Sequence, residues 1–222
     1  MLRWFLVNHA LITQSYFNLP IDNYITSSCT ISQHTVYKNG QPLFVNPTAD
    51  LSDFLLSVYQ YLHLKYVRFY KMDNLSKLGW LASEILLKDS FEPENHKPEE
   101  IGIILSNANS SLDTDLKYAQ SIKDIPSPSV FVYTLPNIMI GEICIRNHFK
   151  GETALFVFER FEARFMEQYV NNLMNNGILQ VCICGWVELV NDEYKAVLFL
   201  VEKNMGAKNE VFSMENMNKY FS

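Results

Sequence analysis

Four cysteines are the side chains of this chain with the greatest capacity for chemistry, because a thiolate can attack a thioester or bind a metal. They are Cys29, Cys144, Cys182 and Cys184, and each lies in an apolar or β-branched stretch. Cys182 and Cys184 flank Ile183, so both thiols should point to one face of a strand. The pair could form a strained disulfide or hold a metal, but buried small hydrophobic side chains are the simpler interpretation. The sequence has no CxxC spacing and no cluster of histidine with cysteine, so we expect no metal and no cofactor.

Composition and charge argue against several classes of function. The chain has 222 residues, of which 48% are hydrophobic and 19% charged, so it can bury a core. Its net charge of −6 argues against binding to nucleic acid or to an anionic membrane surface. No apolar run reaches the ~20 residues that a membrane helix needs, and we find no signal-peptide cleavage site. Together with scattered thiols, which suit a reducing compartment, these features indicate a cytoplasmic protein.

Segments with the period of a strand alternate with segments with the period of a helix. Strands are predicted at 24–32, 101–105, 154–158, 178–186 and 194–202, and helices at 50–63, 72–87, 113–121, 137–148 and 159–176. Asn39-Gly40 and Asn191-Asp192 predict turns, and prolines predict loops at 42–47 and 126–136. The order predicts a layered α/β domain with a mixed five-stranded sheet covered by helices.

We expect one domain over residues 1–222. Its core spans about residues 24–203, preceded by an extension over 1–23. A polar tail over 204–222 should end in a short helix or in disorder.

Five short segments follow one another in a distinctive order. They are Tyr24–Ser32, Lys71–Gly79 with its Met-Asp pair, Ile101–Ser106 followed by Thr114-Asp115, Ser127–Glu142 with Ser-Pro, Leu-Pro-Asn and Gly-Glu, and Val181–Glu188 with a glycine and a glutamate. The ordered set covers about residues 24–203 and resembles the amino-terminal half of a β-ketoacyl-(acyl carrier protein) synthase. The resemblance implies a thiolase-like fold and a relationship to enzymes that extend carbon chains by condensation on an acyl carrier protein.

The residues that carry the chemistry of that family are absent. The family places a cysteine at the elbow between its third strand and a buried helix, where the helix amino terminus favours the thiolate. Counting back from Gly177 puts Arg160 or Phe161 at this position, and no cysteine lies between Cys144 and Cys182. We also expect the family's second half, with its two histidines, to be missing. The five histidines are interpreted as surface or loop residues: His9, His34, His63, His96 and His148.

Charged side chains surround the expected elbow. Glu159, Arg160 and Glu162 lie at the start of the predicted helix, opposite an aromatic stripe that begins at Phe161. A solvated helix face is the simpler interpretation. The alternative is a new polar site formed by Glu159, Arg160 and Glu162 with Asn137 of the Leu-Pro-Asn segment.

An aromatic cluster at residues 59–70 is accompanied by Arg68, Lys71 and Lys77. The aromatic residues could form a binding surface, although packing in and around the core is the simpler interpretation. The cations could meet the acidic helix of an acyl carrier protein, although a solvated face explains them as well.

Three hypotheses of function follow. In the first, the chain is a non-catalytic ketosynthase-like subunit of fatty-acid or polyketide-type biosynthesis, which forms a homodimer or pairs with a complete ketosynthase. In the second, it is an active 3-oxoacyl-carrier-protein synthase or acyltransferase with an unconventional site or one shared between chains. In the third, it is a ligand-binding or structural protein that reuses the fold. All three favour an oligomer, because half of a thiolase-like fold would leave an apolar face uncovered.

Overall fold

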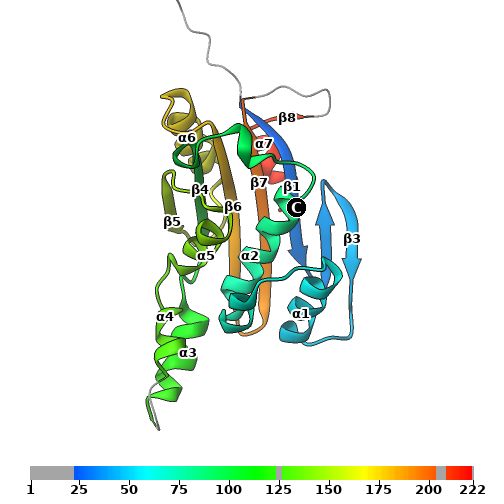
Figure 1. Cartoon of the computed structure of the whole chain (residues 1–222), viewed down its shortest axis with the longest axis vertical. Helices are drawn as coiled ribbons and strands as arrows, with labels where there is room; N and C mark the ends of the chain where they lie inside the picture. The colour runs from blue at the N-terminus through cyan, green and yellow to red at the C-terminus, as the bar shows by residue number, and fades with distance from the viewer. Residues whose placement is uncertain (1–22, 124–126, 204–208, 222) are drawn as a thin grey trace, which may run out of the picture.

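An eight-stranded mixed sheet forms the centre of the molecule in a computed structural model, which describes residues 23–123, 127–203 and 209–221 (Figure 1). The strand order is β3-β2-β1-β7-β6-β4-β5, and β8 also pairs with β1. β4 pairs in parallel with β5 and β6, and the other pairs are antiparallel. The bounds are β1 Tyr24–Ser32, β2 Thr35–Lys38, β3 Gln41–Val45, β4 Ile101–Asn107, β5 Thr153–Val157, β6 Val181–Val190, β7 Glu193–Glu202 and β8 Glu210–Val211.

The five predicted strands are present as β1, β4, β5, β6 and β7, and the α/β class with a mixed sheet is confirmed. The predicted number of strands is wrong, because β2, β3 and β8 extend the sheet beside β1. Asn39-Gly40 forms the expected turn, but it joins two short strands, and β3 replaces most of the predicted 42–47 loop. Pro42 is tolerated because β3 is an edge strand, where a missing N–H need not break a ladder on both sides.

Helices lie on both faces of the sheet. Their bounds are α1 Leu51–Tyr61, α2 Asn74–Leu87, α3 Leu112–Ser121, α4 Pro128–Val132, α5 Ile138–Asn147, α6 Ala163–Asn175 and α7 Met214–Asn218, with short 3₁₀ turns η1 Val67–Lys71, η2 Pro93–Asn95 and η3 Pro98–Glu100. Asp50 and Asp73 begin α1 and α2, because their carboxylates accept hydrogen bonds from the backbone N–H groups of Asp53 and Ser76. None of the described helices is long and apolar enough to cross a membrane.

Two helical predictions need correction. The predicted helix 159–176 begins only at Ala163, so residues 159–162 form a turn between β5 and α6. The predicted loop around Pro128 contains the short helix α4, which Pro128 can begin because the first N–H of a helix has no partner within it.

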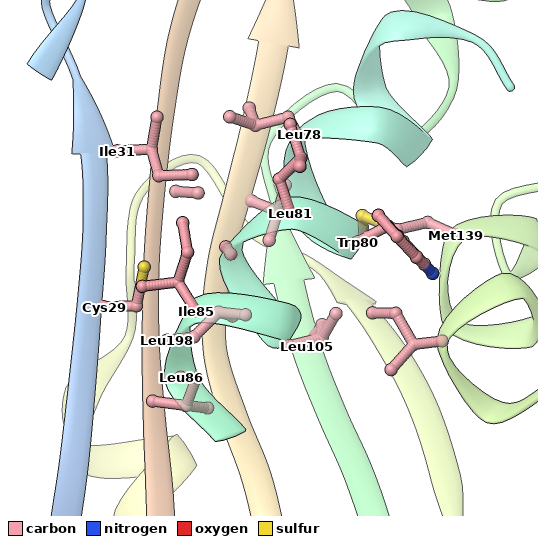
Figure 2. Close-up of a cluster of buried hydrophobic side chains, with 14 of the residues drawn as sticks. Cys29, Ile31, Leu78, Trp80, Leu81, Ile85, Leu86, Leu105, Met139 and Leu198 are labelled. Atoms are coloured by element: carbon pink, nitrogen blue, oxygen red, sulfur yellow. The ribbon is translucent and has the colours of Figure 1, made fainter. Parts of the chain in front are cut away.

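The larger apolar core lies between the sheet and the side that carries α1, α2 and α5. Figure 2 shows Leu78, Leu81 and Ile85 of α2 facing Ile31 and Leu198 of the sheet. These side chains are at most 1% exposed, so α2 fixes the position of the central strands.

The smaller core lies on the opposite face, beneath α6 and α7. Cys182 and Cys184 point into this core, whereas Ile183 between them belongs to the larger one, as their alternation predicted. Cys182 and Cys184 are fully buried in this core, as the simpler interpretation of the pair predicts, and Cys144 is half-buried. Phe212 and Met217 of the tail are buried against this face of the sheet.

Candidate functional site

The parallel strands β4 and β5 end beside each other, and the loops that follow them meet at this edge of the sheet. Phe158 after β5 donates its backbone N–H to the carbonyl of Asn107 at the end of β4 (3.0 Å). Glu188 near the end of β6 accepts hydrogen bonds from the backbone N–H groups of Ala108 and Asn109 and from the Asn109 side chain. The carboxyl ends of parallel strands are where α/β folds place ligands, so this edge is the candidate site.

The elbow, defined as residues 158–162 between β5 and α6, contains the charged candidates. Arg160 lies 3.3 Å from Glu162, with side chains 86% and 43% exposed. A shallow, open hollow of about 610 Å³ is lined by Phe158, Glu159, Arg160, Glu162 and Phe165. The structure therefore gathers Glu159, Arg160 and Glu162 at one hollow, but Asn137 precedes α5 and does not line it.

The elbow offers charge but no nucleophile for acyl transfer. Its residues are Phe-Glu-Arg-Phe-Glu, with neither thiol nor hydroxyl. Burial raises the pKa of the Cys144 thiol on α5 to about 11 and raises the pKa of Cys29 and Cys184, which disfavours their thiolates. No group of three or more metal-ligating side chains occurs among the described residues. The elbow therefore presents two carboxylates and one guanidinium at an open hollow.

Two of the segments that carry the sequence resemblance meet in space. The Thr114 hydroxyl at the start of α3 donates a hydrogen bond to the carboxylate of Asp73. The same carboxylate caps α2 by accepting a hydrogen bond from the backbone N–H of Ser76. Both side chains act in structure here, because they fix the amino-terminal ends of two helices to each other.

A buried carboxylate network lies between η1, α4 and α5, and the sequence argument missed it. Glu142 is 1% exposed and accepts a bidentate contact from Arg68, with distances of 3.0 and 2.8 Å, and a 3.2 Å hydrogen bond from the Tyr133 hydroxyl. The position of Glu142 within the apolar run Ile138–Ile145 was the available signal, since a buried carboxylate requires a partner. The Arg68 side chain is half exposed, so its guanidinium reaches solvent as well as Glu142.

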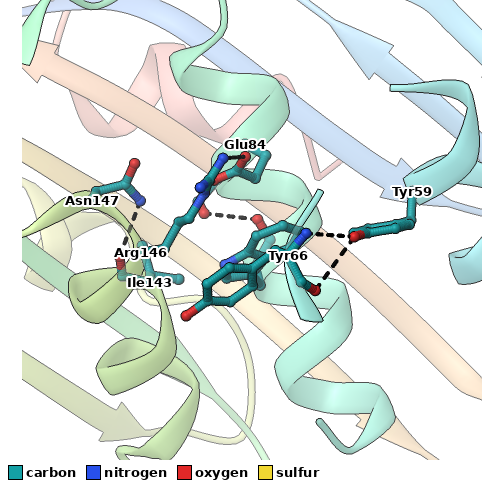
Figure 3. A network of polar contacts seen from close by, with 8 residues as sticks. Tyr59, Tyr66, Glu84, Ile143, Arg146 and Asn147 are labelled. Carbon is teal, nitrogen blue, oxygen red and sulfur yellow. Dashed lines mark hydrogen bonds and ion pairs between the residues drawn. The ribbon is translucent and has the colours of Figure 1, made fainter. Parts of the chain in front are cut away.

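The aromatic cluster packs mainly inside the molecule. Tyr59 stacks on Phe69 with centroids 4.2 Å apart, and Tyr66 stacks on Trp80 at 5.2 Å. Figure 3 shows the backbone of Tyr66 bonded to the Tyr59 hydroxyl, close to the pair of Arg146 and Glu84. Burial raises the pKa of Glu84, and Arg146 opposes part of that shift. Packing therefore accounts for these rings, while Tyr61 and Tyr70 remain exposed.

Comparison with solved structures identifies the fold. The ishigamide ketosynthase/chain length factor aligns with a TM-score of 0.63 and 17% identity, covering 86% of this chain and 64% of its own. A β-ketoacyl synthase from Burkholderia phymatum gives 0.59 and 10%, covering 82% and 59%. The ketosynthase ApeO in complex with its chain length factor ApeC, from Xenorhabdus doucetiae, gives 0.54 and 14%, covering 83% and 80%.

The chain has the ketosynthase-like, thiolase-type fold that its sequence resembles, and it spans about 64% of the length of the first of these structures. No family model and no curated protein sequence matches the chain.

Proposed function

We propose that this chain is a non-catalytic, ketosynthase-like subunit of fatty-acid or polyketide-type biosynthesis that pairs with a complete ketosynthase. One observation carries the proposal: the elbow where the fold would hold an acyl-accepting cysteine contains only Phe158, Glu159, Arg160, Phe161 and Glu162. A chain without an acyl acceptor can still contribute a binding surface to a complex with an active ketosynthase. The solved complex of a ketosynthase with its chain length factor is a precedent for such pairing in proteins of this fold.

The free edge of β5 supports pairing with another chain. Among the strands of the described residues, β5 pairs with β4 alone and lies at one end of the sheet (Figure 1). The backbone N–H of Phe158 donates to β4, and successive N–H groups of a strand point to alternate sides. The N–H of Val157 therefore points away from β4, and the Val157 side chain is 55% exposed. An unpaired strand edge is a template for another strand.

An apolar arm formed by α3 and α4 extends away from the sheet on the side of β5 (Figure 1). Large apolar side chains on and beside the arm are more than 40% exposed: Leu116, Ile122, Phe131, Val132 and Leu135. A patch of this kind is typical of a surface that a partner covers. The arm and the β5 edge together favour a partner that is itself a folded chain.

The basic strip around η1 supports a transient contact with an acyl carrier protein. Lys65, Arg68 and Lys71 are exposed beside Val67 and Tyr70, in a chain whose net charge is −6. Local positive charge in an acidic protein favours an acidic partner and accelerates its association. Because Arg68 also holds Glu142, we expect this contact to be weak.

The acyl-acceptor test decides between this proposal and an active enzyme. The chain is incubated with acyl and malonyl thioesters of an acyl carrier protein, alone and with a complete ketosynthase from the same genome, and intact masses are measured. We expect acylation of the ketosynthase only, and a stable complex of the two chains by size-exclusion chromatography with light scattering. An acyl adduct on this chain would establish the active-enzyme alternative, and the absence of any complex would remove the proposed subunit role.

A further inference from the structure

Residues 209–221 form a strap across the α6 side of the molecule. β8 pairs Glu210 and Val211 with β1, and α7 follows. Phe212 and Met217 are at most 2% exposed, whereas Val211 is 42% exposed. The backbone N–H of Met214 donates to the Glu167 carboxylate of α6 at 3.0 Å. The strap is therefore held by two buried side chains, by the short β8–β1 pair and by the backbone bond of Met214 to α6, in addition to the contacts of its last residues.

The strap ends on the elbow. The ring of Phe221 stacks on Phe161 with centroids 4.2 Å apart and planes 10° from parallel, and the Lys195 ammonium lies 4.9 Å from the Phe221 centroid. Tyr220, next to Phe221, packs edge-on against Phe199 at 5.1 Å and accepts a 3.2 Å hydrogen bond from Ser28. The last two described residues thus connect β1, β7 and the elbow.

Phe161 is the side chain through which the middle of the elbow contacts the rest of the described structure. Glu159 and Arg160 are exposed, and the Arg160–Glu162 ion pair is local. Phe161 contacts only two rings among the described residues, Phe221 at 4.2 Å and Trp186 at 6.4 Å. The stacked Phe221 is the closer of the two and comes from the strap.

We infer that the strap is a conformational switch: it opens as one unit, and its opening releases the elbow through loss of the Phe161–Phe221 stack. A five-residue helix has no stability of its own, so α7 depends on its anchors and opens more easily than the sheet. The ends of the elbow are held by the backbone bond of Phe158 to β4 and by the first turn of α6, whereas Glu159 and Arg160 in its middle are exposed. Phe161 packs against the smaller core and the strap, so loss of the stack should loosen the middle of the elbow. A partner that binds Phe161 would have to displace Phe221 and with it the strap. While the strap is docked, the Phe161 ring is covered by Phe221. The inference is independent of whether the chain accepts an acyl group.

Hydrogen exchange by mass spectrometry on the full chain tests the switch. We expect Phe221→Ala to speed exchange about tenfold both in peptides covering 212–221 and in peptides covering 158–165, with exchange in β4 and β6 unchanged. Val211→Ala is the matched control, because it removes an exposed side chain from the same strap. Faster exchange in the strap alone would overturn the coupling, and so would equal effects of both variants on the elbow.

A measurement on the unaltered chain keeps the inference testable if Phe221→Ala does not fold. Exchange is followed at increasing urea concentrations below the unfolding transition. Strap and elbow amides should show the same opening free energy and the same urea dependence, both smaller than those of β6 and β7. Elbow amides that open only with the sheet, or independently of the strap, would disprove the switch.

Discussion

At the scale of single residues, two buried carboxylates attach α5 to the rest of the molecule. Glu142 on α5 is held by Arg68 of η1, and Glu84 on α2 is held by Arg146 of α5 at 3.2 Å. Removal of one partner from a buried ion pair usually costs about 3–5 kcal/mol, but the Arg68 side chain is 51% exposed, which reduces the cost there. Glu142 and Arg146 are four residues apart, so the two pairs act on one face of α5 and orient the helix that leads into β5.

Glu84 gives the stability of the protein a pH dependence of predictable sign. Burial raises its pKa above the ordinary value of 4.5, so the folded state binds this proton more tightly than the unfolded state. Between the ordinary and the raised pKa the folded state carries more of this proton, so the contribution of Glu84 to the free energy of unfolding falls as pH rises. Glu84→Gln should remove this fall. Urea unfolding of both proteins at a series of pH values from about 4 to about 7 measures the difference.

Glu99→Gln is the control for this experiment, because it removes a carboxylate that is 62% exposed. If the profile of Glu84→Gln runs parallel to that of the unaltered protein over the whole series, burial of Glu84 does not control the pH dependence.

At the scale of elements, the antiparallel pairing of β6 with β7 depends on Gly185. This glycine has φ +145°, and a Cβ atom there would overlap the backbone carbonyl oxygen of Val197 on the neighbouring strand. Its own carbonyl accepts a 3.2 Å hydrogen bond from Ser106 of β4. The glycine is therefore required by the close approach of three strands, which explains its place in the segment Val181–Glu188.

Two glycine-to-alanine variants test this requirement. Gly185→Ala should lower the free energy of unfolding by about 3 kcal/mol or more, because strain in φ adds to the overlap with backbone. Gly141→Ala, within α5 and with no heavy atom within 4 Å of the added Cβ, should raise it by roughly 0.5–1 kcal/mol. Urea denaturation measures both variants. A Gly185→Ala protein as stable as the parent would show that β6 and β7 can separate at little cost.

At the scale of the whole molecule, the two edges of the sheet are not equivalent. β3 at one edge contains Pro42, which discourages the addition of another strand. β5 at the other edge has no proline and lies on the same side as the apolar arm of α3 and α4. Association with another chain should therefore use the β5 edge.

Proline at each edge tests this asymmetry. The backbone N–H of Val157 on β5 and that of Val45 on β3 both point outward, since Phe158 and Asn46 bond inward. Val157→Pro should raise the dissociation constant of the complex about tenfold or more, a loss of ~1.4 kcal/mol, and Val45→Pro should leave it unchanged. Analytical ultracentrifugation of each variant, alone and with the complete ketosynthase, measures this constant. Equal effects of the two substitutions would exclude β5 as the interface.

The sequence alone determined the class of fold and the absence of a thiol from the elbow. Long apolar runs such as Ile101–Leu105 and Val181–Trp186 encode buried strands locally, and helical periodicity encodes the helices between them. The order of short motifs identified a ketosynthase-like fold, and the solved structures share that fold. The sequence alone also shows that no cysteine lies between Cys144 and Cys182. The domain limits and the site residues from the sequence remain predictions.

Only the tertiary structure decided what these segments contact. Strands β2, β3 and β8 have two to five residues, too few for a periodic pattern. β2 and β8 form along β1, and β3 forms along β2. The Arg68–Glu142 pair joins residues 74 positions apart, and the Phe161–Phe221 stack joins the elbow to the tail. Contacts between distant segments depend on how the chain packs, and local sequence does not record them.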